Sequence, residues 1–294
     1  MFSFKERAIK FIFSCLAFSC LLFLLAIVVI LFWQGAPLFS YMDFSQFFFG
    51  KSWYPTSQPP EFGIFPLISG SLIVTLGAMV VCVPLGIGSA LYIYELSGPN
   101  SKKILKPIVE ILGSIPSIVF GFFALTIAAP AIQQFFNIPT GLCALTASII
   151  LGIMAIPTIT SISEDALSFV PNSFREASYA LGANKFQTLF KVTIPAAASG
   201  ISTSVILGMS RIVGETMTVL MVSGGAAVIT SSFFSPVRPM TATIAAEMGE
   251  AAFGSLHYQA LFAIALVLFM TTLVFNVIAE RISQKYALKL GANR

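Results

Sequence analysis

Long apolar runs, separated by short polar segments, make up most of this chain. Six of the runs are about 20 residues long or longer, which is the length that a helix needs to cross the hydrocarbon core of a bilayer. We expect the membrane-spanning helices at about 9–33, 67–95, 108–135, 142–165, 197–225 and 257–280. The first run follows a basic segment, as in a signal peptide, but it is longer than the roughly 7–15 apolar residues of a signal core, so we expect it to be retained. The pattern predicts an all-α integral membrane protein with six transmembrane helices.

The lysines and arginines gather on one side of the predicted spans. Thirteen of the sixteen lie near the two ends of the chain, from Lys5 to Lys10 and from Arg281 to Arg294, or in the loops after the second and fourth spans. Because cytoplasmic loops of membrane proteins are enriched in Lys and Arg, we expect both termini and these two loops in the cytoplasm. The same bias accounts for the net charge of +4, so the charge requires no nucleic-acid partner.

The loop between the fourth and fifth spans has the sequence signals of two short helices. Ser173 and Glu176 have the spacing of a capping box, in which each side chain bonds the backbone N–H of the other residue. Asn184 and Gln187 repeat that spacing, and Gly182 between the two pairs suits a helix C-terminus. We expect a helix, a glycine break and a second helix on the cytoplasmic side. A hairpin that merely lies on the lipid surface is the alternative.

Two ionisable residues lie inside the fifth predicted span. Arg211 and Glu215 are four residues apart and would share one face of a continuous helix. A charge at that depth costs at least about 2.5–3.5 kcal/mol, so it points to a function. The guanidinium fork of Arg211 matches a phosphate bidentately, and Glu215 would hold or gate it. In the alternative, the two charges only neutralise each other for insertion.

The outer loops carry the remaining candidates. The last of them, at about 226–256, contains Arg238, Glu247 and Glu250, with a short helix expected over 241–248. We expect a solvated face for both glutamates, and a contact with whatever delivers the solute is a second interpretation of all three residues.

Composition excludes several classes of function. Hydrophobic residues make up 57% of the chain and charged residues 10%, compared with roughly a quarter charged in soluble domains. The four cysteines lack metal-ligand spacing and are interpreted as small packing residues. The Gly50-Lys51-Ser52 sequence is no Walker A loop, because position 45 is Ser where that motif has Gly. We therefore expect no metal and no cofactor on this chain.

The cytoplasmic loop resembles the EAA loop of ABC-transporter permeases, in which Glu-Ala-Ala is followed by Gly and then by Ile-x-Leu-Pro. The matching positions are Glu176, Ala177, Ser178, Gly182, Val192, Ile194 and Pro195. Ser178 replaces the second alanine. In that family the loop is the coupling helix that docks on the ATPase subunit. The resemblance therefore implies ATPase-coupling roles for Ser173, Glu176, Ala177, Ser178, Gly182 and Pro195.

Three further stretches narrow the resemblance to one group of permeases. Segments 114–124, 210–217 and 238–250 resemble the corresponding motifs of phosphate permeases of the PstC type, rather than those of the PstA-type sister subunit. The resemblance implies a type I importer architecture in the bacterial inner membrane. It also implies a first helix with a long periplasmic loop over 1–66 and a permease domain over 67–294, with the coupling loop at 172–195.

The same resemblance implies the partners. They are a PstA-type sister permease, two PstB-type ATP-binding subunits that hold the ATP, and a PstS-type extracytoplasmic phosphate-binding protein. The expected function is the permease half of an ATP-driven phosphate importer, and the chain itself is expected not to be an enzyme. Sulfate or molybdate import is an alternative, because Arg211 alone does not separate oxyanions. An ion-coupled secondary transporter is a second alternative, although no internal repeat is visible.

Overall fold

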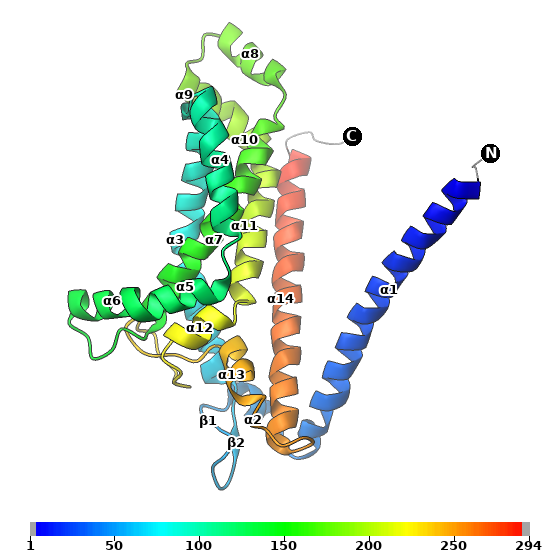
Figure 1. Ribbon diagram of the computed structural model, residues 1–294, viewed down its shortest axis with the longest axis vertical. Coiled ribbons are helices and arrows are strands. Elements are labelled where there is room, and N and C mark those ends of the chain that lie inside the picture. Colours follow the sequence, from blue (N-terminus) through cyan, green and yellow to red (C-terminus); the bar gives the residue numbers. More distant parts are fainter. Residues whose placement is uncertain (1–3, 290–294) are drawn as a thin grey trace.

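The computed structural model describes residues 4–289 and consists mainly of helices that run along one axis (Figure 1). The long axial helices are α1 (Phe4–Gly35), α3 (Phe65–Leu91), α4 (Pro99–Gly113), α7 (Ala144–Ser168), α11 (Ala198–Val213) and α14 (Leu256–Lys289). Among the described residues, five helical segments are long and apolar enough to cross a membrane, and a bent pair that ends with α11 makes a sixth. The prediction of an all-α membrane protein is confirmed. Arg294, one of the expected cytoplasmic cations, lies outside the described residues.

Short elements occupy both ends of the bundle (Figure 1). At one end lie η1 (Ala36–Ser40), α2 (Phe44–Phe49), the antiparallel pair of β1 (Trp53–Tyr54) and β2 (Glu61–Phe62), and α13 (Met240–Glu247). At the other end lie η2 (Tyr92–Leu96), α8 (Asn172–Ala180), α9 (Lys185–Thr188), η4 (Leu189–Thr193) and α10 (Ile194–Ala196). The start of α1 and the end of α14 point toward the α8 end, as expected if all three are cytoplasmic. We refer to these ends as the outer and the inner end.

Helices α3 and α7 form the centre of the main hydrophobic core. Small residues let the two backbones approach, as is common between membrane helices. A Cβ added at Gly86 would lie 2.7 Å from Cγ2 of Ile159 on α7. Polar side chains add bonds between the same helices, since Thr160 Oγ1 donates to Gly86 O at 3.1 Å and Ser148 Oγ donates to Val74 O at 3.3 Å. The α3–α7 pair is therefore the rigid centre on which the other helices pack.

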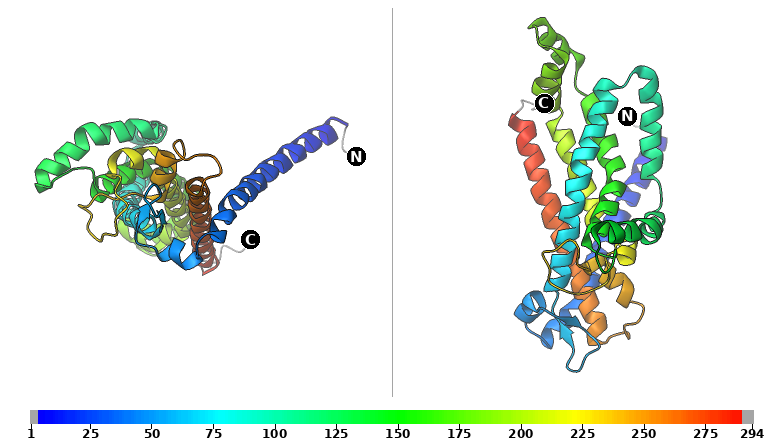
Figure 2. Two further views of the ribbon diagram at one scale, coloured as in Figure 1. Left: turned by 90° about the horizontal axis from the view of Figure 1, so that it is seen from below. Right: turned by 90° about the vertical axis from the view of Figure 1, so that its left-hand side faces the viewer.

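The third predicted span, 108–135, is wrong as a single helix. Helix α4 ends at Gly113, and α5 (Ser117–Phe123) begins after Pro116, which occupies its N-cap position. The path then continues through η3 (Ala124–Ala128) and α6 (Ala129–Phe136), which run across the bundle axis (Figures 1 and 2). Pro116 has no N–H, and the residue before a proline is driven out of the helical region, so the break falls where the chemistry permits it.

The fifth predicted span, 197–225, is also broken. Helix α11 ends at Val213, and α12 (Met217–Val222) begins after three intervening residues in a new direction (Figure 1). Gly214 and Thr216 flank Glu215 in the non-helical segment. At its other end α11 is bent by 68° from the helical segment that ends with α10. The expectation that Arg211 and Glu215 share one helical face is therefore wrong.

A second hydrophobic core closes the outer end of the molecule. Phe47 of α2 and Trp53 of β1 pack with Leu261 and Ile264 of α14 and with Met240 of α13. The long loop after α1 thus packs on the last helix of the chain instead of standing apart from it. The division of the chain at residue 66 stays a prediction.

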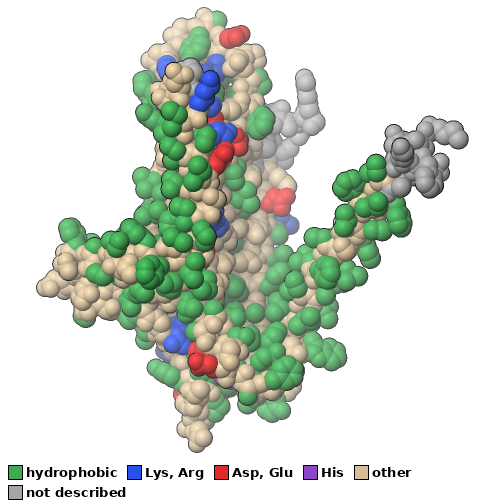
Figure 3. Space-filling model, viewed as in Figure 1, with side chains coloured by type: hydrophobic (Ala, Val, Ile, Leu, Met, Phe, Trp, Pro, Cys, Tyr) green, Lys and Arg blue, Asp and Glu red, His purple; other side chains and the backbone are tan. Residues whose placement is uncertain are grey.

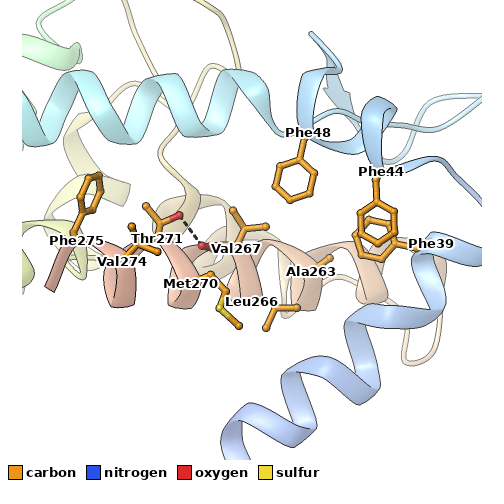
Figure 4. Close-up of a pocket in the computed structure, with 10 residues that line it drawn as sticks. All are labelled: Phe39, Phe44, Phe48, Ala263, Leu266, Val267, Met270, Thr271, Val274 and Phe275. Carbon is orange, nitrogen blue, oxygen red and sulfur yellow. Dashed lines mark hydrogen bonds between the residues drawn. The ribbon is translucent and has the colours of Figure 1, made fainter. Parts of the chain in front are cut away.

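Helix α1 leaves the bundle at an angle and contacts it mainly near its outer end (Figures 1 and 2). Gly35 permits this contact, because an added Cβ would lie 3.1 Å from the backbone N of Ala263. Beside the junction is an apolar cavity of about 380 Å³ between α14 and the ring side chains of Phe39, Phe44 and Phe48 (Figure 4). Its lining is almost entirely hydrocarbon and contains no charged residue, so it does not suit an anion.

We predict that Gly86→Ala lowers the melting temperature of the detergent-solubilised protein. The added methyl would overlap the Ile159 side chain, and overpacking of this kind costs about 1–3 kcal/mol. Gly88→Ala is the matched control on the same helix, because a Cβ there meets nothing within 4 Å. Equal melting temperatures for the two variants would contradict the assigned packing of α3 on α7.

Candidate functional site

The inner end carries a helix–turn–helix segment, formed by α8, Gly182 and α9. Gly182 has φ of +81°, a left-handed conformation that glycine adopts without strain. Asn184 Oδ1 accepts from the N–H of Gln187 at 2.8 Å, and Gln187 Oε1 accepts from the N–H of Asn184 at 2.9 Å. The predicted glycine break and the second capping box are confirmed. We call residues 172–195 the coupling segment, after the role that the resemblance implies for them.

The first predicted capping box, between Ser173 and Glu176, is wrong. Helix α8 already begins at Asn172, with Pro171 at the N-cap position and no side-chain cap. Ser173 is thus inside the first turn, where its side chain cannot cap the N–H of residue 176. Proline has a fixed φ and no N–H that needs a partner, so it suits the start of a helix. Helix α8 therefore starts directly after Pro171, which is earlier than the Ser–Glu spacing indicates.

Most of the other predicted coupling residues lie on the exposed face of this segment. Glu176, Ala177 and Gly182 are exposed, whereas Ser178 is buried and its Oγ lies 2.9 Å from Thr188 Oγ1 of α9. Ser178 therefore joins the two short helices to each other and does not face outward. Pro195 lies in α10, directly before the bend into α11.

A buried glutamate anchors the coupling segment to α3. Glu95 of η2, which continues α3, accepts from Arg175 Nη2 of α8 at 3.1 Å. Lys185 of α9 donates to the Glu95 backbone carbonyl at 2.7 Å and lies 3.6 Å from Oε1. Arg175 also donates to the Tyr94 hydroxyl at 3.0 Å and lies over its ring at 5.4 Å. Helices α8 and α9 thus both contact Glu95.

A second ionic cluster ties α4 to α7 near the inner end, where charged side chains gather in Figure 3. Glu164 accepts from Lys102 at 2.6 Å and from Lys106 at 2.8 Å, and Lys106 also contacts Asp165 at 2.5 Å. Lys106 is thus held between two carboxylates of α7. The inner half of the broken third span is therefore fixed to the central helix pair.

Arg211 bridges the broken third span and α7. Its Nη1 donates to Thr158 Oγ1 at 2.9 Å, and its Nη2 donates to the Gly113 carbonyl at the end of α4 at 3.2 Å. The side chain is only half-buried. A carbonyl left without a helical N–H therefore receives a cationic donor, and part of the guanidinium remains accessible.

Glu215 satisfies a backbone donor of the helix that follows it. Its Oε1 accepts from the N–H of Thr218, in the first turn of α12, at 3.2 Å, whereas Thr216 at the N-cap position makes no side-chain cap. Thr218 Oγ1 donates across to the Ser117 carbonyl of α5 at 2.9 Å, and Thr241 Oγ1 of α13 donates to the Glu215 carbonyl at 2.8 Å. No ion pair joins Arg211 to Glu215 among the described residues. The neutralising pair considered from the sequence is wrong, because the break at Gly214 separates the two side chains.

The two helix breaks therefore meet at one level of the bundle. The carbonyls of Gly113 and Ser117 flank the first break, and both accept from the second broken span. A cavity of about 10 Å³ next to the second break is lined by Ser71, Thr75, Glu215 and Thr241 together with six apolar residues. This is room for about one water molecule, so a solute would need the breaks to separate.

The outer candidates form a network around one carboxylate. Glu247 accepts from Arg238 at 2.6 Å, from Trp53 Nε1 at 3.0 Å, and lies 2.9 Å from His257 Nε2. Its side chain is 14% exposed, so the expected solvated face is wrong for Glu247. Glu250 is exposed, as expected. The network links β1, α13 and the start of α14.

Residues 82–288 match a family described as "Binding-protein-dependent transport system inner membrane component". The chain is 40% identical over 240 residues to a probable ABC transporter permease protein, YqgH, of Bacillus subtilis, covering 82% of this chain and 78% of that protein. It is 33% identical over 279 residues to the phosphate transport system permease protein PstC of Mesorhizobium japonicum, covering 88% and 83%. The chain belongs to this permease family.

Solved structures agree on the fold of the permease. A chain of a bacterial alginate ABC transporter superposes with a TM-score of 0.66 at 13% identity, covering 96% of both chains. A chain of the inward-facing MetNI methionine ABC transporter gives 0.55 at 21% identity, covering 76% of this permease and 94% of that chain. At these identities the likeness shows the fold alone, which is that of ABC importer permeases.

Sequence reasoning missed Glu95, Glu164 and Thr158. The two glutamates lie near the inner ends of apolar runs, where a carboxylate is easily interpreted as an interfacial charge. One signal was present for Glu164. It lies at the end of the fourth predicted span that faces the same side as the loop with Lys102 and Lys106, so it can pair with these lysines. Nothing local marks Thr158, since its partner Arg211 lies 53 positions away.

We predict that Glu247→Gln lowers the melting temperature of the permease, whereas Glu250→Gln does not. The first change removes the charge that pairs with Arg238 and His257, and the loss of one partner of a half-buried charged hydrogen bond costs about 1–3 kcal/mol. Glu250 is exposed and serves as the matched control. The same melting temperature in both variants would contradict a structural role for the outer network.

Proposed function

We propose that this permease forms half of the translocation pathway of an ATP-driven phosphate importer. The Arg211 site carries the proposal. It is a half-exposed guanidinium at the level where two spans are broken, with the hydroxyl of Thr158 beside it. Arg is well suited to bidentate binding of a tetrahedral oxyanion, and irregular backbone inside a membrane protein commonly lines a polar pathway. The PstC relatives, which are named as phosphate permeases, support phosphate as the oxyanion.

The coupling segment supports an ATPase on a separate chain. It presents apolar side chains at the inner end with no partner in the described chain, among them Leu181 at 89% exposure and Phe186 at 60%. Exposed apolar side chains that gather on one end of a protein are typical of a docking surface. ATP would be bound and hydrolysed by that partner, in keeping with two PstB-type subunits per complex.

The side of the bundle that carries α5 and η3 supports a sister permease. Phe122, Leu125 and Ile127 are exposed there, beside the broken spans. In the proposed complex a PstA-type chain would cover this side and supply the other half of the pathway. A PstS-type binding protein would deliver phosphate at the outer end, where Arg238, Glu247 and Glu250 lie. The complex would reside in the bacterial inner membrane.

We predict that Arg211→Gln lowers uptake of labelled phosphate by at least about tenfold in proteoliposomes that hold the whole complex, because loss of a charged hydrogen-bond donor to an anion costs about 1.5–3 kcal/mol. Arg211→Lys keeps the charge without the planar fork and should retain part of the activity. Arg281→Gln is the control, since Arg281 is exposed near the inner end of α14.

If the affinity for phosphate and the rate of uptake are unchanged in Arg211→Gln, Arg211 is not part of the pathway. Competition by excess unlabelled sulfate or molybdate in the wild-type complex distinguishes the other oxyanions from phosphate. Uptake that continues after ATP depletion would favour a secondary transporter instead.

We predict that Leu181→Asp reduces the amount of ATPase that co-purifies with the permease by about tenfold, because it places a charge at the centre of an apolar docking surface. Leu181 is almost fully exposed in this chain, so the melting temperature of the isolated permease should not change. Phe253→Asp is the control, as an equally exposed apolar residue at the outer end. Full retention of the ATPase by Leu181→Asp would place the docking surface elsewhere.

A further inference from the structure

We propose that Glu95 is the positioning residue that transmits movement of the coupling segment to the transmembrane bundle, and that its negative charge is needed to convert ATP hydrolysis into transport. The inference rests on the proposed function, because it assigns the route by which the docked ATPase would act. Neither the EAA motif nor the Arg211 site contains this residue.

The contacts of Glu95 come from both halves of the coupling segment. Arg175 of α8 reaches Oε1 at 3.1 Å, and Lys185 of α9 reaches the same oxygen at 3.6 Å and the backbone carbonyl at 2.7 Å. Because Gly182 separates the two short helices, this shared carboxylate is a second joint between them besides the Ser178–Thr188 contact. A displacement of either helix therefore acts on η2.

Burial makes the carboxylate depend on these cations. The Glu95 side chain is only 3% exposed, whereas those of Arg175 and Lys185 are 24% and 52% exposed. Its second oxygen, Oε2, is buried and has no hydrogen-bond partner among the described residues. A buried carboxylate that loses its cations is strongly destabilised, so Glu95 and the coupling segment are expected to move together. Oε2 is therefore an unused acceptor that either cation would meet on shifting along the carboxylate.

The covalent routes out of the coupling segment are less direct. Toward α11 the chain passes through the 68° bend beyond α10. Toward α7 it passes through the turn at Val170 and Pro171. By contrast, η2 continues α3 without a break, and α3 packs along α7. The Glu95 contacts thus give the shortest path from the docking surface to the rigid centre of the bundle.

The test uses the whole complex in proteoliposomes, with phosphate uptake and ATP hydrolysis measured on the same preparation. Glu95→Gln keeps the size of the side chain and removes its charge. We expect ATP hydrolysis to change by no more than about twofold while phosphate uptake falls by about tenfold, so that more ATP is hydrolysed per phosphate. Glu95→Asp should recover part of the uptake. Glu280→Gln is the control, as an exposed glutamate near the inner end of α14.

A mutant cycle separates this role from general loss of structure. Arg175→Gln should raise the ratio of ATP hydrolysed to phosphate transported as Glu95→Gln does, and the double variant should be no worse than either single variant. If the Glu95→Gln complex does not assemble, the ratio of ATP hydrolysed to phosphate transported is measured in Arg175→Gln and Lys185→Gln instead. A raised ratio in both would support the role of Glu95. A wild-type ratio in the assembled variants would overturn the inference. A wild-type complex that takes up no phosphate would instead overturn the proposed function.

Discussion

Backbone groups that are released where a membrane helix breaks must find partners inside the protein, because the bilayer core offers none. In this permease two broken spans satisfy one another at the same level. Arg211 donates to the carbonyl that ends α4, and Thr218 donates to the carbonyl in the first turn of α5. Thr241 of α13 adds a donor to the Glu215 carbonyl at the second break. Polar groups are thereby concentrated deep in an apolar bundle, and the closed arrangement is held by hydrogen bonds that a solute could replace.

At each end of the molecule, buried or half-buried glutamates pair with cations from neighbouring elements. Glu95 and Glu164 fix the coupling segment and α4 at the inner end, and Glu247 fixes the outer loops. The outer network reaches the break through α13, because Glu247 ends this helix and Thr241 lies in its first turn. Movement at either end would therefore act on the same polar level through helices that remain intact.

Much of the fold was predictable from the sequence, because membrane thickness fixes the length of apolar runs. The glycine turn at Gly182 and the Asn184–Gln187 capping box were also predictable, since both depend on residues close in sequence. The helix breaks were missed, because the predominantly apolar runs continue past Pro116 and Gly214 for long enough to fit single spans. The partners of Arg211 and Glu95 were missed for another reason. They come from helices more than 50 positions away, so no local pattern contains them.

We propose that nucleotide bound to a separate ATPase opens the polar level beside Arg211 to alternate sides of the membrane. Site-directed labelling of Ser117→Cys in a complex without other reactive cysteines tests it directly. The Ser117 side chain is half-exposed at the first break, and only its carbonyl bonds Thr218. A membrane-impermeant thiol reagent, applied to one side of the proteoliposomes, should reach this cysteine from opposite sides in the nucleotide-free and nucleotide-trapped complexes. Labelling from the same side, at the same rate, in both states would contradict alternating access at this level.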